Sequence, residues 1–338
     1  MPTRAAIYGC SGLALTEAEK RFFKDAEPWG FIVFARNIAS PQQLRALTDE
    51  FRDIAGPDVP VLIDQEGGRV ARLRPPQWRA YPAGRRYGEL YARSREQGLE
   101  AVRLASRLIA AELTAVGVNV DCLPVLDVPV PGAHDVIGDR AYGETPGPVI
   151  ALGRAAAEGL LEGGVLPIIK HIPGHGRAGV DSHLSLPVVV ADARTLTDTD
   201  FAPFKALADM PIAMTAHVVY SAIDAHAPAT TSRIVIDDII RGTIGFDGFL
   251  MSDDVSMQAL KGTIAERTRA SLKAGCDIAL HCNGEMKEME AVASEAPLLA
   301  GDALRRSAAA LARLSAPEDF DEQAGLARFA ELMGTSWG

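Results

Sequence analysis

The stretch "VLPIIKH" (residues 165–171) has five apolar residues in a row and ends on a lysine and a histidine. A strand that helices cover on both faces is apolar throughout, whereas a strand with one face in water alternates apolar and polar residues. We therefore predict a central parallel strand here, with its polar groups at the carboxyl end.

Seven other runs have the same nearly uniform apolar character, and helix-length segments separate them. Residues 41–55 follow Ser40, a suitable N-cap, and begin with proline, while residues 94–116 are rich in helix formers and stop at Gly117. Eight strands that alternate with helices predict an α/β fold, a (β/α)8 TIM-type barrel. The seven runs are "AAIYGC" (5–10), "GFIVFAR" (30–36), "VPVLIDQE" (59–66), "NVDCLPVLDV" (119–128), "IAMTAHVV" (212–219), "GFLMSDD" (248–254) and "DIALHCN" (277–283).

A doubly wound open sheet is the alternative fold. Such a sheet usually carries a glycine-rich phosphate-binding turn after its first strand, and "CSGLAL" (10–15) matches that turn poorly. The chain shows no linker, fixed-period repeat or low-complexity tract. We expect one catalytic barrel domain over residues 1–338, with C-terminal helices from about 284 to 338 packed on it.

The composition is typical of a globular protein, with 48% hydrophobic and 23% charged residues among 338. A formal net charge of −10 disfavours nucleic acid as the main partner, because phosphate binding needs local positive charge. The start of the chain does not resemble a secretory signal, and no segment approaches the roughly 18 apolar residues of a membrane span. We expect a cytoplasmic protein with no membrane partner and with reduced core cysteines at positions 10, 122, 276 and 282.

Polar residues end several of the predicted strands. In a (β/α)8 barrel the carboxyl ends of all strands meet at one mouth, where such barrels hold their active sites. A single charged residue at a strand end is usually a solvated or capping group, but five of the eight ends carry one. We therefore predict a site built from Asp64, Glu66, Asp127, Lys170, His171, His217, Asp253 and Asp254.

The densest polar segment is "KHIPGHGRAGVDSH" (170–183). His171 and His175 are four residues apart, which suits a metal site on a helix, but the proline and glycines between and beside them oppose a helix. The glycines do not follow the order of a phosphate-binding P-loop either. A loop that leaves the fifth strand is the interpretation that remains.

Asp181 and His183 stand two residues apart in this loop. At this spacing the carboxylate can accept a hydrogen bond from one ring nitrogen, fix the tautomer and raise the basicity of the imidazole. An Asx-turn followed by an exposed histidine is the alternative explanation. Asp253 and Asp254 are adjacent on a strand, so only one of them is expected to face the pocket, as a nucleophile opposite the His/Asp pair. No G-x-S-x-G elbow competes for that role.

These motifs resemble those of the family 3 glycoside hydrolases, in particular the short single-domain β-N-acetylglucosaminidases of bacterial peptidoglycan recycling. The combination of "KH-x-PGHG", "DSH" and a late "SDD" is highly specific, and the resemblance covers most of the chain and implies the same barrel. The matching segments are "GFIVFARNI" (30–38), "IDQEGGRVARL" (63–73), "PVLDV" (124–128), "VIGDRAYG" (136–143), "KHIPGHG" with "DSH" (170–183), "AHVVY" (216–220) and "FLMSDDVSM" (249–257).

Carried over residue by residue, the resemblance implies Asp253 as the catalytic nucleophile, His183 as the general acid/base and Asp181 as its dyad partner. It implies no metal and no cofactor. The sugar-binding residues that it implies are Asp64, Arg72, Arg140, Lys170 and His171.

Four other polar residues receive lesser roles. We interpret Arg69 as structural, His175 as a residue that organises its loop, and His217 as a group behind the site. His281 stands where an aliphatic residue is usual in the family, and a buried neutral histidine is the expected explanation.

The implied reaction is the retaining removal of a non-reducing N-acetylglucosamine from muropeptide fragments by a monomer, through a covalent glycosyl-enzyme intermediate. Three alternatives remain open at this point. The first is a phosphorylase on the same site, and the second is a metal-dependent hydrolase that uses His171, His175 and His183. The third is a sugar-binding protein without activity.

Overall fold

The computed structural model describes residues 3–182 and 185–334. Its main sheet contains β1 (Arg4–Gly9), β2 (Pro28–Val33), β3 (Val61–Ile63), β4 (Val120–Asp121), β5 (Leu166–Ile172), β7 (Ile212–Thr215), β9 (Phe249–Asp254) and β10 (Ile278–His281). These strands close into a parallel barrel in chain order, and β10 pairs with β1 to complete it. Each strand overlaps one of the eight apolar runs, so the predicted barrel is confirmed and the open sheet is wrong.

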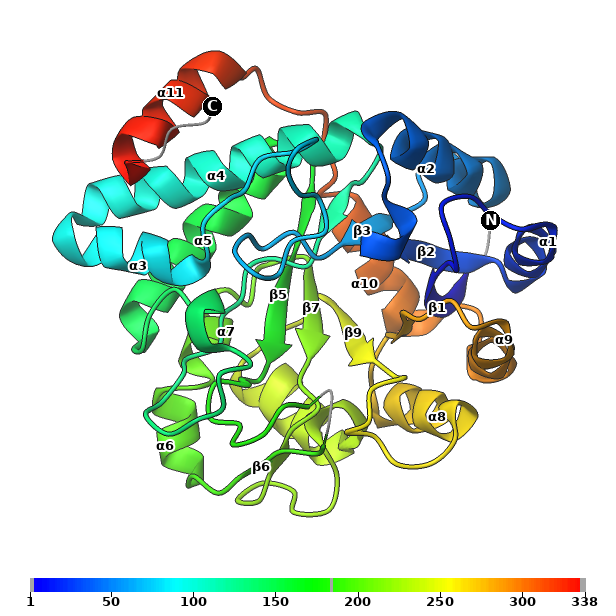
Figure 1. Ribbon diagram of the computed structural model, residues 1–338. Coiled ribbons are helices and arrows are strands. Elements are labelled where there is room, and N and C mark those ends of the chain that lie inside the picture. Colours follow the sequence, from blue (N-terminus) through cyan, green and yellow to red (C-terminus); the bar gives the residue numbers. More distant parts are fainter. Residues whose placement is uncertain (1–2, 183–184, 335–338) are drawn as a thin grey trace.

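Helices connect the strands and surround the barrel (Figure 1). A separate two-stranded parallel sheet, β6 (Val188–Val189) with β8 (Val219–Tyr220), joins the loops that follow β5 and β7. The helices are α1 (Glu17–Ala26), α2 (Pro41–Ala55), α3 (Gly84–Arg93), α4 (Arg95–Ala115), α5 (Pro146–Glu162), α6 (Ala193–Asp198), α7 (Ala202–Ala206), α8 (Ile264–Ala274), α9 (Met286–Glu295), α10 (Gly301–Leu311) and α11 (Glu322–Met333), with short 3-10 turns η1 (Ala35–Asn37), η2 (Gly138–Arg140) and η3 (Ala229–Thr231) and a π-helix η4 (Val235–Thr243).

The barrel strands face two apolar layers. In β1, Ala5 and Ile7 belong to the layer that fills the barrel, whereas Ala6 and Tyr8 belong to the layer under the surrounding helices. Both faces of the strand are therefore dry, and residues 5–9 are all buried. This double burial is the physical reason why the strand sequences are apolar throughout.

The predicted helix signals at α2 and α4 are present. The Ser40 hydroxyl accepts a hydrogen bond from the Gln43 N–H at 3.2 Å, and Pro41 occupies the first turn of α2. After α4, Gly117 adopts a φ of +79°, and a Cβ at this position would lie 2.4 Å from the Thr48 hydroxyl. Glycine therefore allows the left-handed turn and the close approach that lead into β4.

The amino end of the barrel is closed by α10. The Trp29 indole N–H in β2 donates to the Ser307 hydroxyl at 2.7 Å, and Leu299 and Ala310 join the layer that fills the barrel. A barrel plugged at this end can open only at the carboxyl ends of its strands.

The last helix packs on the outside of the barrel wall. Figure 1 shows α11 beside α4, where Phe329 is buried and Arg328 lies 2.7 Å from Glu100. None of the described helices is long and apolar enough to cross a membrane.

Candidate active site at the barrel mouth

A cavity of about 350 Å³ opens at the carboxyl ends of the strands. Six of the residues to which the sequence assigned a role in catalysis or sugar binding line it: Asp64, Arg72, Arg140, Lys170, His171 and Asp253. Glu66 and Asp254 also border the cavity, together with the less polar Ile32, Phe34, Val70, Met214, Met257, Leu280 and Cys282.

Lys170 lies at the centre of a buried ion network. Its ammonium nitrogen is 2.8 Å from Asp64 Oδ1 and 2.6 Å from Glu66 Oε1, and only 2% of the residue is exposed. Burial by itself lowers the pKa of Lys170, but the two carboxylates outweigh burial and raise the pKa well above its ordinary value. Lys170 is therefore a permanent cation in the wall of the cavity.

Two arginines complete this network. Arg140 donates from Nε and Nη2 to the two oxygens of Glu66, both at 2.8 Å, and Arg72 donates to Asp64 Oδ2 at 2.9 Å. Burial raises the pKa of both carboxyls, but the neighbouring cations more than offset it and hold each pKa below its usual range. Both acids therefore remain ionised and keep acceptor capacity toward the cavity.

His171 is oriented by Asp127, which is fully buried. The His171 ring Nδ1 lies 2.7 Å from Asp127 Oδ2, and the backbone N–H groups of His171 and His175 donate to Asp127 Oδ1 at 3.2 and 2.6 Å. Although burial opposes ionisation, His171 and these hydrogen bonds lower the pKa of Asp127 to about 2. An ionised carboxylate accepts from Nδ1–H, which leaves Nε2 as the ring nitrogen available to a ligand.

The sequence placed Glu66 and Asp127 among the strand-end residues of the predicted site but assigned neither a catalytic nor a sugar-binding role. Both prove to be partners of residues that were predicted to bind sugar. The signal that could have found them is the charge balance, because buried cations such as Lys170 and Arg140 require buried carboxylates nearby.

The end of β9 differs from the strict alternation that the sequence suggested. Both Asp253 and Asp254 border the cavity, because the pairing of β9 with β10 shifts register just before Asp254. The Asp254 carboxylate accepts from the Ser256 N–H at 2.9 Å and from the Ser256 hydroxyl at 2.7 Å, which fixes the turn after the strand. Asp253 Oδ1 accepts from the Asp254 N–H at 2.8 Å.

The loop after β5 is anchored by His175. Its ring Nε2 lies 3.0 Å from the buried Ser182 hydroxyl, and burial is the main reason why its pKa falls to about 4. Asp181 lies beside Ser182, and its carbonyl accepts from the Ser185 N–H at 3.0 Å. His183, the predicted general acid/base, lies outside the described residues, so the predicted dyad stays a prediction.

Arg69 contributes to the rim of the site through a different set of contacts. Its guanidinium lies 2.9 Å from Asp139 and donates to the carbonyl oxygens of Asp135 and Val136 at 2.6 and 2.9 Å. These contacts tie the loop after β3 to the turn that carries Arg140, which agrees with the structural interpretation of Arg69.

Residues 9–313 match the glycosyl hydrolase family 3 N-terminal domain. The chain is a family 3 glycoside hydrolase. The resemblance that the motifs indicated is therefore confirmed, and the polar cavity lies where this barrel architecture holds its chemistry.

Several relatives of this family 3 chain agree over nearly its whole length. A Beta-hexosaminidase from Aromatoleum aromaticum is 36% identical over 323 residues, which cover 94% of this chain and 90% of that protein. A Beta-hexosaminidase from Thioalkalivibrio sulfidiphilus is 42% identical over 80% of this chain and 78% of its own. NagZ from Neisseria gonorrhoeae, solved in complex with N-trifluoroacetyl-D-glucosamine, has a TM-score of 0.89 at 32% identity, with coverage of 98% and 99%.

The metal-dependent alternative names His171, His175 and His183, and the last of these lies outside the described residues. Within residues 3–182 and 185–334, no group of three or more His, Cys, Asp or Glu side chains could hold a metal ion. His171 and His175 are instead engaged by Asp127 and Ser182.

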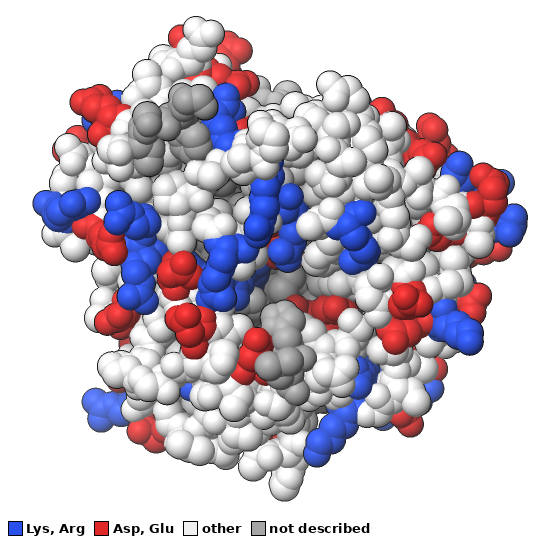
Figure 2. Space-filling view, in the orientation of Figure 1, with Lys and Arg blue, Asp and Glu red and all other residues white. Residues whose placement is uncertain are grey.

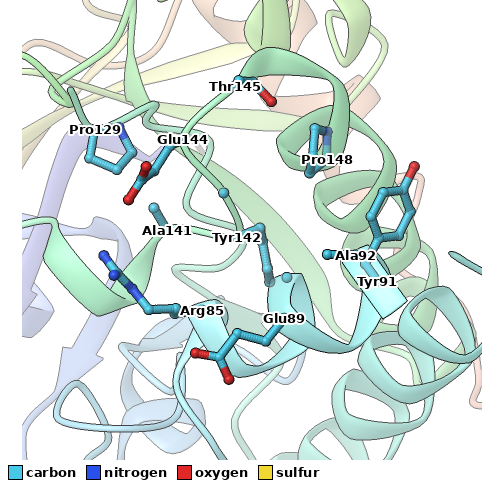
Figure 3. Close-up of a pocket in the computed structure, with 12 residues that line it drawn as sticks. Arg85, Glu89, Tyr91, Ala92, Pro129, Ala141, Tyr142, Glu144, Thr145 and Pro148 are labelled. Atoms are coloured by element: carbon cyan, nitrogen blue, oxygen red, sulfur yellow. The ribbon is translucent and has the colours of Figure 1, made fainter. Parts of the chain in front are cut away.

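This hydrolase has a second, wider hollow of about 610 Å³ (Figure 3). It lies between α3 and the 141–148 segment, and the figure shows Arg85 and Glu144 beside it. Arg140, which lines the active-site cavity, directly precedes this segment in the sequence. On the face shown in Figure 2, Lys and Arg side chains gather above the centre, and Asp and Glu side chains lie below and beside them.

Proposed function

We propose that this hydrolase is a retaining exo-β-N-acetylglucosaminidase that removes non-reducing N-acetylglucosamine from muropeptide fragments during cell-wall recycling in the cytoplasm. The observation that carries the proposal is the convergence of Asp253 with the Asp64, Glu66 and Lys170 network on one small cavity. Its volume is near the lower end of the roughly 300–1,000 Å³ range of ligand pockets, which suits a single sugar residue. The relatives named Beta-hexosaminidase and NagZ support the same substrate class.

The buried network retains groups that can bind sugar hydroxyls. An ammonium group has three N–H donors, and Lys170 directs two of them at Asp64 and Glu66, so one remains for a hydroxyl oxygen. Each Asp64 oxygen accepts one bond from a cation and has a further lone pair for a hydroxyl donor. His171 can add its Nε2 from the adjoining wall, since Asp127 occupies Nδ1.

The proposed reaction has two steps with inversion at each. Asp253 attacks the anomeric carbon, the glycosidic bond breaks, and His183 gives its proton to the departing oxygen. The neutral imidazole then takes a proton from water, whose oxygen attacks the same carbon and releases Asp253. Asp181 holds the imidazole in position for both transfers, a role that rests on the sequence motif "DSH".

The leaving group of a muropeptide fragment is an anhydro-N-acetylmuramic acid that carries a peptide. The hollow between α3 and the 141–148 segment, which follows Arg140 in the sequence, has room for part of that peptide. Arg85 at this hollow is exposed and provides a cation for peptide carboxylates.

Hydrolysis of 4-nitrophenyl N-acetyl-β-D-glucosaminide by the wild type and Asp253→Ala tests the proposal. We expect turnover by the wild type, a loss of at least about 10³-fold in the variant, and little turnover of the matching β-glucoside. The assay is repeated with phosphate, because sugar 1-phosphate as the main product would show a phosphorylase, and with a strong chelator, because lost activity would show a metal enzyme. An undiminished Asp253→Ala variant would show that Asp253 is not the nucleophile.

A further inference from the structure

The end of β9 extends beyond its regular pairing with β7. The register between the two strands runs from the pair Ile212 and Phe249 to the pair Met214 and Met251 and stops there. Asp253 and Asp254 follow two and three residues later, at the edge of the cavity. Backbone pairing with β7 therefore does not explain how the end of β9 is held on this side.

Two side chains that follow Met214, the last residue of β7 that pairs with β9, contact the backbone at the end of β9. The Thr215 hydroxyl accepts from the Asp253 N–H at 3.4 Å, a long bond, and the His217 Nε2 lies 3.0 Å from the Asp254 carbonyl oxygen. The contacts thus hold the backbone immediately before and after the peptide that joins Asp253 to Asp254.

A third side chain links these two anchors. The Thr230 hydroxyl, in η3, lies 2.8 Å from the Thr215 hydroxyl and 2.7 Å from the His217 Nδ1. Thr215, His217 and Thr230 are all fully buried. The three side chains and the end of β9 therefore form a closed ring of hydrogen bonds behind the cavity.

The partners in this ring favour one direction for its protons, and the Thr230 hydroxyl also lies 3.1 Å from the Ala216 carbonyl oxygen, a second and longer acceptor contact. A carbonyl oxygen only accepts, so His217 Nε2 carries the ring proton and donates to Asp254. Burial lowers the pKa of His217, so the neutral ring has a lone pair on Nδ1 that accepts from the Thr230 hydroxyl. Thr230 then accepts from Thr215, and Thr215 accepts from the Asp253 N–H.

We propose that His217 is a positioning residue for Asp253, which it holds at the correct depth for attack through Thr230, Thr215 and the Asp254 carbonyl. The inference rests on the proposed function, because it takes Asp253 as the nucleophile. His217 touches no substrate in this arrangement. Misplacement of a reacting group by about 1 Å can lower a rate by about 10²-fold, which is the effect expected when the ring is broken.

The test compares His217→Ala, His217→Gln and His217→Asn. Glutamine can place an amide N–H near the position of Nε2 and restore the bond to Asp254, whereas the shorter asparagine reaches only toward Thr230. His281→Ala is the matched control, because His281 is also fully buried at a strand end but contacts Glu288, at 3.0 Å, on the outer side of the barrel. The probes are 4-nitrophenyl N-acetyl-β-D-glucosaminide, free N-acetylglucosamine as a competitive inhibitor, and a 5-fluoro glycosyl fluoride that labels the nucleophile.

We expect His217→Ala to lower kcat by about 10²-fold while KM and the inhibition constant of N-acetylglucosamine change less than about threefold. The rate of covalent labelling should fall by the same factor as kcat. His217→Gln should recover at least about tenfold over His217→Ala, and His217→Asn should not. His281→Ala should retain kcat within about threefold of the wild type.

The failures of the two proposals can be told apart. If the wild type does not cleave the substrate, or Asp253→Ala cleaves it equally well, the proposed function is wrong whatever His217 does. If both behave as proposed while His217→Ala keeps a kcat within threefold of the wild type, the positioning role is wrong. An equal loss in His217→Ala and His281→Ala, or a change in KM alone, would also overturn it.

Discussion

The two sides of the active-site cavity are held by different kinds of interaction. On the side of β3 and β5, Lys170 lies between the carboxylates of Asp64 and Glu66. On the side of β7 and β9, neutral hydroxyl and imidazole groups of Thr230 and His217 hold the strand end. A buried charge that loses its partner costs several kcal/mol, whereas a neutral hydrogen bond contributes about 1 kcal/mol. The charged side should therefore contribute most to stability and sugar binding, and the neutral side should chiefly determine the position of Asp253.

Lys170→Met is expected to have the largest effect, because it removes the buried cation that lies between Asp64 and Glu66 and leaves these two carboxylates close together with one arginine each. We expect the free energy of unfolding to fall by about 3–5 kcal/mol and activity to be lost. Urea unfolding followed by circular dichroism measures the first effect, and Lys261→Met, at an exposed lysine, is the control. A loss below about 1 kcal/mol would contradict the view that charges hold this side.

Asp121→Asn tests the charged side through pH. Asp121 is fully buried on β4, its Oδ1 accepts from the Gln65 N–H at 2.9 Å, and burial raises its pKa to about 8. The unfolded chain releases this proton near pH 4, but the folded protein keeps it until about pH 8, so the folded state binds more protons between these values. The stability that depends on this proton is therefore complete below about pH 4 and is lost as the pH rises toward 8.

Asparagine keeps the acceptor oxygen and cannot titrate. We therefore expect Asp121→Asn and the wild type to unfold at the same urea concentration near pH 4. The variant should become progressively more stable than the wild type as the pH rises, by at least about 2 kcal/mol at pH 8. A stability difference that does not change between these pH values would show that Asp121 is already ionised in the folded protein.

The charged side of the cavity was easier to predict from the sequence than the neutral side, and the kinds of interaction explain why. The uniform apolar runs predicted all eight strands, and the polar strand ends predicted Lys170, Asp64 and Asp253, because a parallel strand buried on both faces leaves few places for charge. The register between neighbouring strands and the direction of the side chains at their ends were harder to predict from the sequence. The shift near Asp254 depends on how β10 meets β9, and alternation along one strand does not contain that information.

The neutral side was the harder part to predict. His217 stood out as a polar residue at the end of a predicted strand, yet Thr215 and Thr230 looked like ordinary strand and loop residues. Their link crosses 15 positions in sequence and exists only because η3 folds back against β7. The position of a hydroxyl residue in the sequence does not indicate its hydrogen-bond partner, whereas a buried charged residue predicts an opposite charge nearby.

Thr230→Val should have the smallest effect on stability and therefore separates the two sides most clearly. Valine keeps the shape of threonine but removes the hydroxyl that links Thr215 to His217 and leaves their buried polar atoms without this partner, so we expect a loss of about 1–3 kcal/mol in unfolding free energy. The kcat should nevertheless fall by about tenfold with KM unchanged, because the ring behind Asp253 is broken. Thr230→Ser, which keeps the hydroxyl, is the control and should retain kcat within about threefold of the wild type.

A double variant tests whether Thr230 and His217 act together. Since Thr230→Val and His217→Ala break the same ring, the variant that carries both should be no slower than His217→Ala alone. Losses that multiply in the double variant would mean that Thr230 and His217 act separately, and the neutral side would then be a set of unrelated contacts.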